Sequence, residues 1–167
     1  VEYWIKIREI FDKYDVLLIA DEVVTGVGRT GKLFGMQNFN VWPDIMTMAK
    51  GLTSGYNPLG SVLTHKNIVC NIPDNTFLIP GYTFTGHPVS CAAGLANLEF
   101  ISEQGFLENV DFTGRYVKEQ LTERIGDSPF TGDIRGIGFF ISLDKRQHLI
   151  EGDDSTHVFG LARRRII

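Results

Sequence analysis

The chain has 167 residues, about the length of one domain, of which 43% are hydrophobic and 22% charged. This composition is typical of a globular protein, and no apolar stretch is long enough to span a bilayer. The formal net charge of −4 gives no electrostatic reason to expect nucleic acid or an anionic membrane as a partner. Cys70 and Cys91 show neither metal-ligand nor disulfide spacing, so we predict reduced thiols, no metal site and a cytoplasmic protein.

The first predicted element is a helix over residues 2–14, because its apolar side chains recur at helical spacing. That apolar face consists of Tyr3, Ile7, Ile10 and Tyr14. The continuous apolar run DVLLIADEVV follows at residues 15–24 and predicts a short strand buried on both faces. A helix that leads into such a strand predicts α/β architecture with a parallel sheet.

Two adjacent carboxylates, Asp21 and Glu22, lie inside this apolar strand. Carboxylates are rarely buried unless they are paired or hydrogen-bonded, and the plainer interpretation is a polar strand end. However, ligand sites in open α/β sheets lie at the carboxyl ends of strands. We therefore predict that Asp21 meets a cationic ligand, since the strand supplies no basic partner, and that Glu22 helps to hold the strand end.

The segment TGVGRTGKLFG, residues 25–35, looks at first like a phosphate-binding loop. It matches G-x-G-x-x-G and falls one residue short of the P-loop pattern. A P-loop places Ser or Thr after its lysine and begins a helix there, whereas Leu33 follows Lys32 and the next residues are not helical in pattern. We interpret the segment as a connecting loop, with a nucleotide-binding module at residues 26–32 as the remote alternative.

The next predicted strand, residues 44–49, is followed directly by Lys50. Most lysines are surface charges, but a lysine in the crevice of a sheet can act as an amine nucleophile. Asp21 and Lys50 each close a predicted strand, so one carboxylate and one amine meet at one sheet edge. Pyridoxal phosphate requires this combination: the lysine forms a Schiff base, and the carboxylate keeps the pyridine nitrogen protonated.

The remaining elements continue the alternation of strands and helices. We predict strands at residues 59–64 and 134–144, and helices at 87–104, at 105–125 and near 156–165. A change of domain is expected around residues 105–130, where the alternation gives way to a long polar-faced helix. Because the sequence opens without methionine inside a helical pattern, we expect an internal or C-terminal fragment of a longer protein.

Three segments of the sequence together resemble a known enzyme family: LLIADEVVTGVGRTGKLFG, PDIMTMAKGLTSGYNPLGSVL and GYTFTGHPVSCAAGLANLEFI. In order and spacing they resemble the class III, omega-amino acid–pyruvate type, aminotransferases of the fold type I pyridoxal-phosphate enzymes. The resemblance implies an α/β fold in which residues 1–104 are the back half of the cofactor-binding large domain, a mostly parallel sheet flanked by helices. Residues 105–167 would begin a small α+β C-terminal domain.

The resemblance also implies a role for each matching residue. Asp21 would pair with the pyridinium nitrogen, and Val23 would pack against the cofactor ring. Lys50 would form the Schiff base and then move the proton between the substrate Cα and the cofactor. Thr83 would donate a hydrogen bond to the cofactor phosphate of the neighbouring subunit in a homodimer, although a turn residue is the plainer interpretation.

The implied reaction transfers an amino group from an omega-amino acid or amine to a keto acid such as pyruvate. It proceeds through a pyridoxal and pyridoxamine phosphate cycle, with these small molecules as the partners. The alternatives are a class III relative of other specificity, such as an aminomutase or an ornithine- or aminobutyrate-type enzyme, and a catalytically incomplete fragment that only dimerises.

Overall fold

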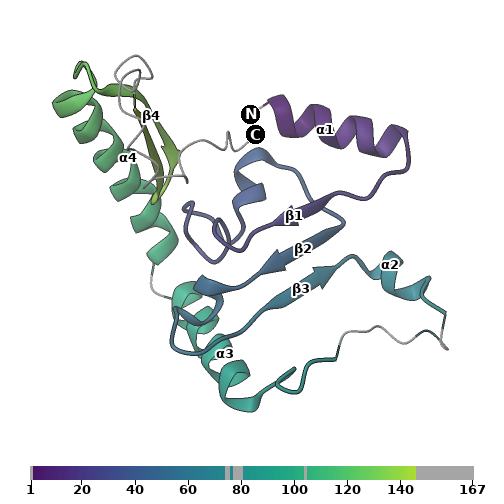
Figure 1. Ribbon diagram of the computed structural model, residues 1–167. Coiled ribbons are helices and arrows are strands. Elements are labelled where there is room, and N and C mark those ends of the chain that lie inside the picture. Colours follow the sequence, from purple (N-terminus) through teal and green to yellow (C-terminus); the bar gives the residue numbers. More distant parts are fainter. Residues whose placement is uncertain (1, 74–75, 77–80, 104, 146–167) are drawn as a thin grey trace, which may run out of the picture.

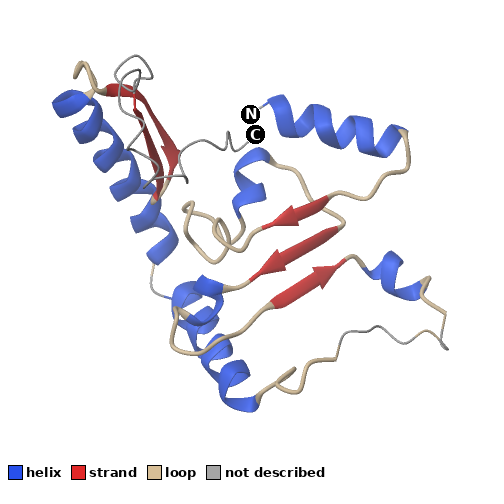
Figure 2. Ribbon diagram, in the orientation of Figure 1, coloured by secondary structure: helices blue, strands red, loops and turns tan. Residues whose placement is uncertain are grey.

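The computed structural model describes residues 2–73, 76, 81–103 and 105–145. The helix expected near residues 156–165 therefore lies outside the described residues. Figures 1 and 2 show the following elements. The helices are α1 (Glu2–Lys13), α2 (Lys66–Cys70), α3 (Pro88–Glu103) and α4 (Phe106–Ile125), with short 3-10 helices η1 (Gly35–Phe39) and η2 (Lys50–Thr53). The strands are β1 (Ile19–Asp21), β2 (Ile45–Met48), β3 (Ser61–Thr64), β4 (Thr131–Ile137) and β5 (Phe140–Lys145).

Helix α1 forms where it was predicted, but it turns a different face to the protein. Trp4, Ile7 and Phe11, which also follow helical spacing, pack against a core cluster. That cluster consists of Leu18, Ala20, Met36 and Val41. Three of the four residues predicted for the buried face are exposed instead, namely Tyr3, Ile10 and Tyr14. Two interleaved apolar stripes were possible in this helix, and the position of the core selects between them.

An ion pair fixes the orientation of α1. Arg8 Nη1 donates to Asp44 Oδ2 at 2.8 Å, and the Leu18 amide donates to the same oxygen at 2.7 Å. Burial raises the pKa of the Asp44 carboxyl, but the Leu18 amide and the Arg8 guanidinium together outweigh burial and hold that pKa below its ordinary value. The bond network ties α1, the start of β1 and the start of β2 together.

The main sheet has the order β1-β2-β3. β1 runs parallel to β2, with Asp21 opposite Thr47, and β3 runs antiparallel to β2, with Ser61 opposite Met48. The described part of the sheet is therefore mixed, where mostly parallel pairing was expected. The connection from β2 to β3 contains only the short helix η2, whereas a parallel return usually carries the chain back along the sheet through an α-helix.

The two faces of this sheet differ. Met46 and Met48 point into a cluster that the α3 residues Leu98 and Ile101 cover. On the other face Ile19 is 60% exposed and Val62 is 67% exposed. The prediction of a strand buried on both faces is thus wrong for β1 in this chain. The strand is three residues long, and only one face of it is covered.

Helix α4 leads to a hairpin, β4–β5, where a single strand over residues 134–144 was predicted. The chain reverses around Gly138, whose φ of 56° lies in the left-handed region that glycine adopts without strain. The hairpin packs on α4, and Figure 1 places both beside the loop that follows β1. Among the described residues, no helix has the length and hydropathy required to cross a membrane.

Candidate active site

The parallel pairing of β1 and β2 brings Asp21 and Lys50 to the same edge of the sheet. Asp21 is the last residue of β1, and Lys50 follows the end of β2 as the first residue of η2. Because parallel strands end at a common edge, the two side chains emerge on one side of the molecule. Both residues are exposed in this chain.

The Asp21 carboxylate is held through one of its oxygens. Its Oδ1 accepts hydrogen bonds from the Val23 amide at 3.0 Å and from Thr47 Oγ1 at 3.3 Å. Across the described ranges, no hydrogen bond is made to Oδ2. One carboxylate oxygen is therefore occupied by the protein, and the other is available to a donor outside it.

Lys50 has an unusual backbone conformation. Its φ is 45°, a left-handed angle that costs a residue with a side chain about 1 kcal/mol or more. The turn that follows it is well fastened: Asn97 Nδ2 on α3 donates to the carbonyls of Gly51 at 2.8 Å and Leu52 at 3.2 Å. Thr53 is buried, and its Oγ1 donates to the Asn57 carbonyl at 2.5 Å. The surrounding contacts thus impose the strained angle on Lys50.

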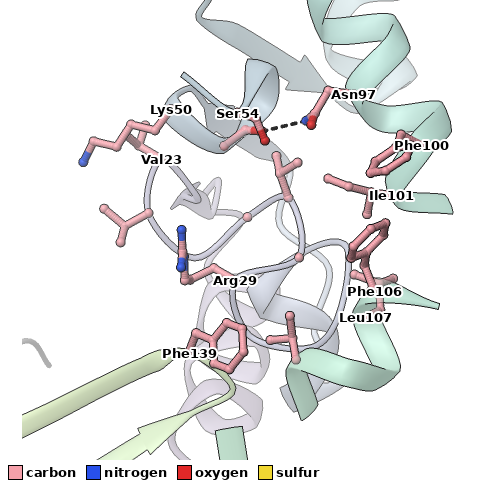
Figure 3. A pocket seen from close by; sticks show the side chains of 16 residues that line it. Val23, Arg29, Lys50, Ser54, Asn97, Phe100, Ile101, Phe106, Leu107 and Phe139 are labelled. Carbon is pink, nitrogen blue, oxygen red and sulfur yellow. Dashed lines mark hydrogen bonds between the residues drawn. The ribbon is translucent and has the colours of Figure 1, made fainter. Parts of the chain in front are cut away.

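A cleft of about 310 Å³ lies beside Lys50 (Figure 3). Val23 and Arg29 line it together with Lys50, and the remaining wall is mostly apolar. That wall includes Phe100, Ile101, Phe106, Leu107 and Phe139. In Figure 3 the amine of Lys50 points away from these apolar side chains. The structure therefore brings Val23 and Lys50 together, and the Lys50 amine faces out of the cleft.

Glu22, the neighbour of Asp21, points to the opposite face of the strand and is only 2% exposed. Its Oε2 accepts from Thr25 Oγ1 at 2.5 Å and from the Gly35 amide at 2.9 Å, and its Oε1 accepts from the Met36 amide at 2.7 Å. Its own amide also donates to the Thr47 carbonyl at 2.9 Å. Glu22 therefore anchors both the strand end and the start of η1, as its predicted holding role requires.

The glycine-rich loop serves packing. No α-helix follows Lys32 directly: residues 31–34 are bends, and the 3-10 helix η1 begins at Gly35. A Cβ on Gly31 would lie 3.0 Å from the Asp111 Cβ of α4. A Cβ on Gly138 would lie 2.8 Å from the Arg29 carbonyl oxygen. Gly31 lies too close to α4, and Gly138 too close to the loop, for a side chain, which accounts for these two glycines without a phosphate ligand.

Thr83 lies apart from the other predicted site residues. It belongs to the exposed turn that precedes α3, and this segment lies beyond β3 from β1 in Figure 1. Its neighbours Tyr82 and Phe84 are strongly exposed, Phe84 to 79%. The structure does not bring Thr83 to Asp21 and Lys50 of its own chain.

Two residues of this region were missed in the sequence. Thr47 contacts Asp21, and its signal was a hydroxyl alternating with Met46 and Met48 in the β2 strand. Asn97 fastens the Lys50 turn, and its signal was a polar side chain in an otherwise apolar helix segment. Both act through contacts between elements that are distant in sequence, so local pattern alone did not select them.

The structure of the chain is similar to solved structures of transaminases. The chain superposes with a TM-score of 0.82 on an amine transaminase from an uncultivated Pseudomonas species, solved in its PLP-bound form. The two are 39% identical, over 87% of this chain and 34% of the transaminase. The fold is thus that of the fold type I transaminases.

Residues 1–161 match the family model "Aminotransferase class-III", and the chain belongs to that family. It is 42% identical to the diaminobutyrate–2-oxoglutarate transaminase of Halomonas elongata, over 85% of this chain and 31% of the relative. It is 43% identical to the putrescine–pyruvate aminotransferase of Pseudomonas aeruginosa, over 85% of this chain and 30% of the relative. The chain spans about a third of the length of these relatives.

Proposed function

We propose that this chain supplies cofactor-binding and catalytic residues of a pyridoxal-phosphate-dependent aminotransferase. The observation that carries the proposal is the juxtaposition of Asp21 and Lys50 at one sheet edge, with one oxygen of Asp21 available. Membership of the class-III family and the PLP-bound transaminase of the same fold support this cofactor. When bound, the cofactor supplies an electron sink for carbanion chemistry at the amine-bearing carbon.

The described residues fit this cofactor. Asp21 would hold the ring nitrogen through Oδ2, and an anion there favours the protonated ring. Val23, in the turn that follows β1 and beside Lys50 in the cleft wall, would pack against the ring. The Lys50 amine would hold the cofactor covalently and would serve as the base for the proton on the substrate Cα. The left-handed turn fixes the backbone from which the Lys50 side chain extends, directly after the end of β2.

Thr83 acts on the cofactor of a second subunit in this proposal. It is remote from Asp21 and Lys50 of its own chain, and it stands in a turn flanked by the exposed Tyr82 and Phe84. Burying such aromatic side chains against a second copy is favourable, and a hydroxyl there can donate to a phosphate. The protein is then a homodimer in which each cofactor site draws on both chains.

The proposed reaction moves an amino group from an omega-amino acid or amine to a keto acid. The putrescine–pyruvate relative supports pyruvate as acceptor, and the diaminobutyrate–2-oxoglutarate relative favours 2-oxoglutarate as the second candidate. We further propose that residues 1–104 belong to the large domain and residues 105–167 begin the small one. Cys70 and Cys91 are exposed free thiols, which suits a reducing, cytoplasmic location.

The test is to mix the full chain with pyridoxal 5′-phosphate, reduce with borohydride and map the labelled peptides. We expect one dominant label at Lys50, lost in Lys50→Ala and weakened in Asp21→Ala. Lys32→Ala, which removes an exposed lysine of the glycine-rich loop, is the matched control and should leave the label unchanged. Labels scattered over surface lysines would overturn the proposal.

The nucleotide alternative predicts a different pattern. It requires ATP to bind through residues 26–32, with binding lost in Lys32→Ala and kept in Lys50→Ala. That outcome would reject the aminotransferase assignment of this site.

A further inference from the structure

Thr47 stands beside Asp21 on the uncovered face of the sheet. The two residues are direct partners in the parallel register of β1 and β2, so their side chains emerge side by side on one face. The neighbours of Thr47 along β2, Met46 and Met48, are buried on the other face. Thr47 is therefore the one β2 side chain next to the Asp21 carboxylate, and its hydroxyl lies 3.3 Å from Oδ1.

A carboxylate on a strand end can rotate about its last torsion, because that torsion has broad minima. Two donors on one oxygen, the Val23 amide and the Thr47 hydroxyl, restrict this rotation. The Val23 amide is part of the main chain, whereas the Thr47 hydroxyl is a property of one side chain. Its β-branched side chain has few rotamers in a strand, so the hydroxyl is held in place.

We infer that Thr47 is a positioning residue for the cofactor: its hydroxyl holds Asp21 Oδ1 so that Oδ2 is directed at the ring nitrogen. The inference rests on the proposed function, since it concerns the same site. Thr47 does not touch the reacting atoms. It acts by fixing the orientation of the one carboxylate that recognises the protonated ring nitrogen, so its effect depends on that nitrogen being present.

The experiment measures binding of pyridoxamine 5′-phosphate, which has the ring nitrogen but forms no bond to Lys50. The full chain is compared with Thr47→Val, which keeps the shape and removes the hydroxyl, and Thr47→Ser, which keeps the hydroxyl. We expect Thr47→Val to weaken binding about three- to tenfold, because a less firmly oriented Asp21 carboxylate meets the ring nitrogen less favourably, and Thr47→Ser to restore most of it.

A deaza analogue, with carbon in place of the ring nitrogen, separates positioning from general damage to the site. Its affinity should be the same for the unchanged chain and Thr47→Val. The matched control is Thr64→Val, which removes a hydroxyl from the neighbouring strand β3. It should change neither the affinity for pyridoxamine 5′-phosphate nor that for the deaza analogue.

Equal affinity of Thr47→Val and the unchanged chain for pyridoxamine 5′-phosphate would overturn the role of Thr47. So would an equal loss for the nitrogen-containing and deaza compounds. Either result leaves the proposed function intact if Lys50 is still labelled by pyridoxal 5′-phosphate. A chain that neither binds pyridoxamine 5′-phosphate nor takes the label at Lys50 overturns both inferences.

Discussion

The two faces of the β1–β2 pair differ in what surrounds them. Glu22 lies on the covered face, with the β2 methionines that α3 packs against, and Asp21 lies on the open face, with Ile19 and Thr47. On the covered face Glu22 is buried and fully engaged with backbone amides and a hydroxyl, beside the packed methionines of β2. On the other face, which no described helix covers, Asp21 is exposed beside the half-buried Thr47 and the exposed Ile19. Of these two adjacent acidic residues, Glu22 therefore serves stability on one face, and Asp21 serves ligand recognition on the other in the function we propose.

The largest expected effect is the loss of stability when the Glu22 carboxylate is removed from the covered face. Glu22→Ala leaves the Gly35 and Met36 amides buried without an acceptor, which should lower the free energy of unfolding by about 3 kcal/mol. Denaturant titration of the chain measures this change. Asp21→Ala, on the open face, is the control and should change the same free energy by less than about 0.5 kcal/mol. Equal losses in both variants would contradict the division between the faces.

Gly114 tests the packing of α4 against the hairpin. In an exposed helix Gly→Ala stabilises by about 1 kcal/mol, but a Cβ here would lie 2.4 Å from the Gly138 carbonyl oxygen. We expect Gly114→Ala to destabilise the chain instead, by about 2 kcal/mol. Thermal unfolding measures the sign, and Glu119→Ala, at an exposed position of the same helix, should stay within about 0.5 kcal/mol. A stabilised Gly114→Ala would show that the close approach is absent.

The role proposed for Asp21 on the open face is tested by measuring the affinity for pyridoxamine 5′-phosphate. Asp21→Ala should weaken pyridoxamine 5′-phosphate by about tenfold or more, because it removes a charge-assisted hydrogen bond to the ring nitrogen. Fluorescence titration measures the affinity, with Asp15→Ala, an exposed carboxylate before β1, as the control. Unchanged affinity in Asp21→Ala would remove Asp21 from the site.

The smallest expected effect is the contribution of the Asp44 carboxylate to the loss of stability at low pH. The Leu18 amide and Arg8 keep the folded-state pKa of Asp44 below its unfolded value, so this carboxylate contributes stability above the unfolded pKa. That contribution disappears as pH falls through the lowered folded-state pKa. In Asp44→Asn, we expect about 1 kcal/mol less stability at pH 7 and a flatter acid limb in unfolding curves. An acid limb as steep as that of the unchanged chain would exclude Asp44 as a contributor.

Sequence patterns that span only a few residues were enough to predict several of the helices and strands. Strands β2 and β3 and helices α3 and α4 lie within the predicted ranges, since their apolar runs, Pro88 and turn glycines act over a few residues. The placement of Asp21 and Lys50 at one edge followed from strand order alone. The roles given to these residues and to Val23 and Thr83 stay predictions.

Other features depended on contacts that no window of sequence contains. The buried side of α1 is chosen by a core that includes Met36 and Val41. The hairpin turn at Gly138 depends on its approach to the Arg29 loop, and the covered side of Glu22 depends on amides in η1. In each case the deciding partner lies many residues away along the chain.

The opposite directions of Asp21 and Glu22 have a consequence for how this sequence can change over evolutionary time. In a strand, inserting or deleting one residue turns every later side chain to the other face. A single-residue insertion within β1 would move Glu22 to the open face and Asp21 into the core, damaging folding and, in the function we propose, cofactor recognition together. Substitutions on the open face can alter the site alone, so this strand tolerates replacement of residues far better than any change in its length.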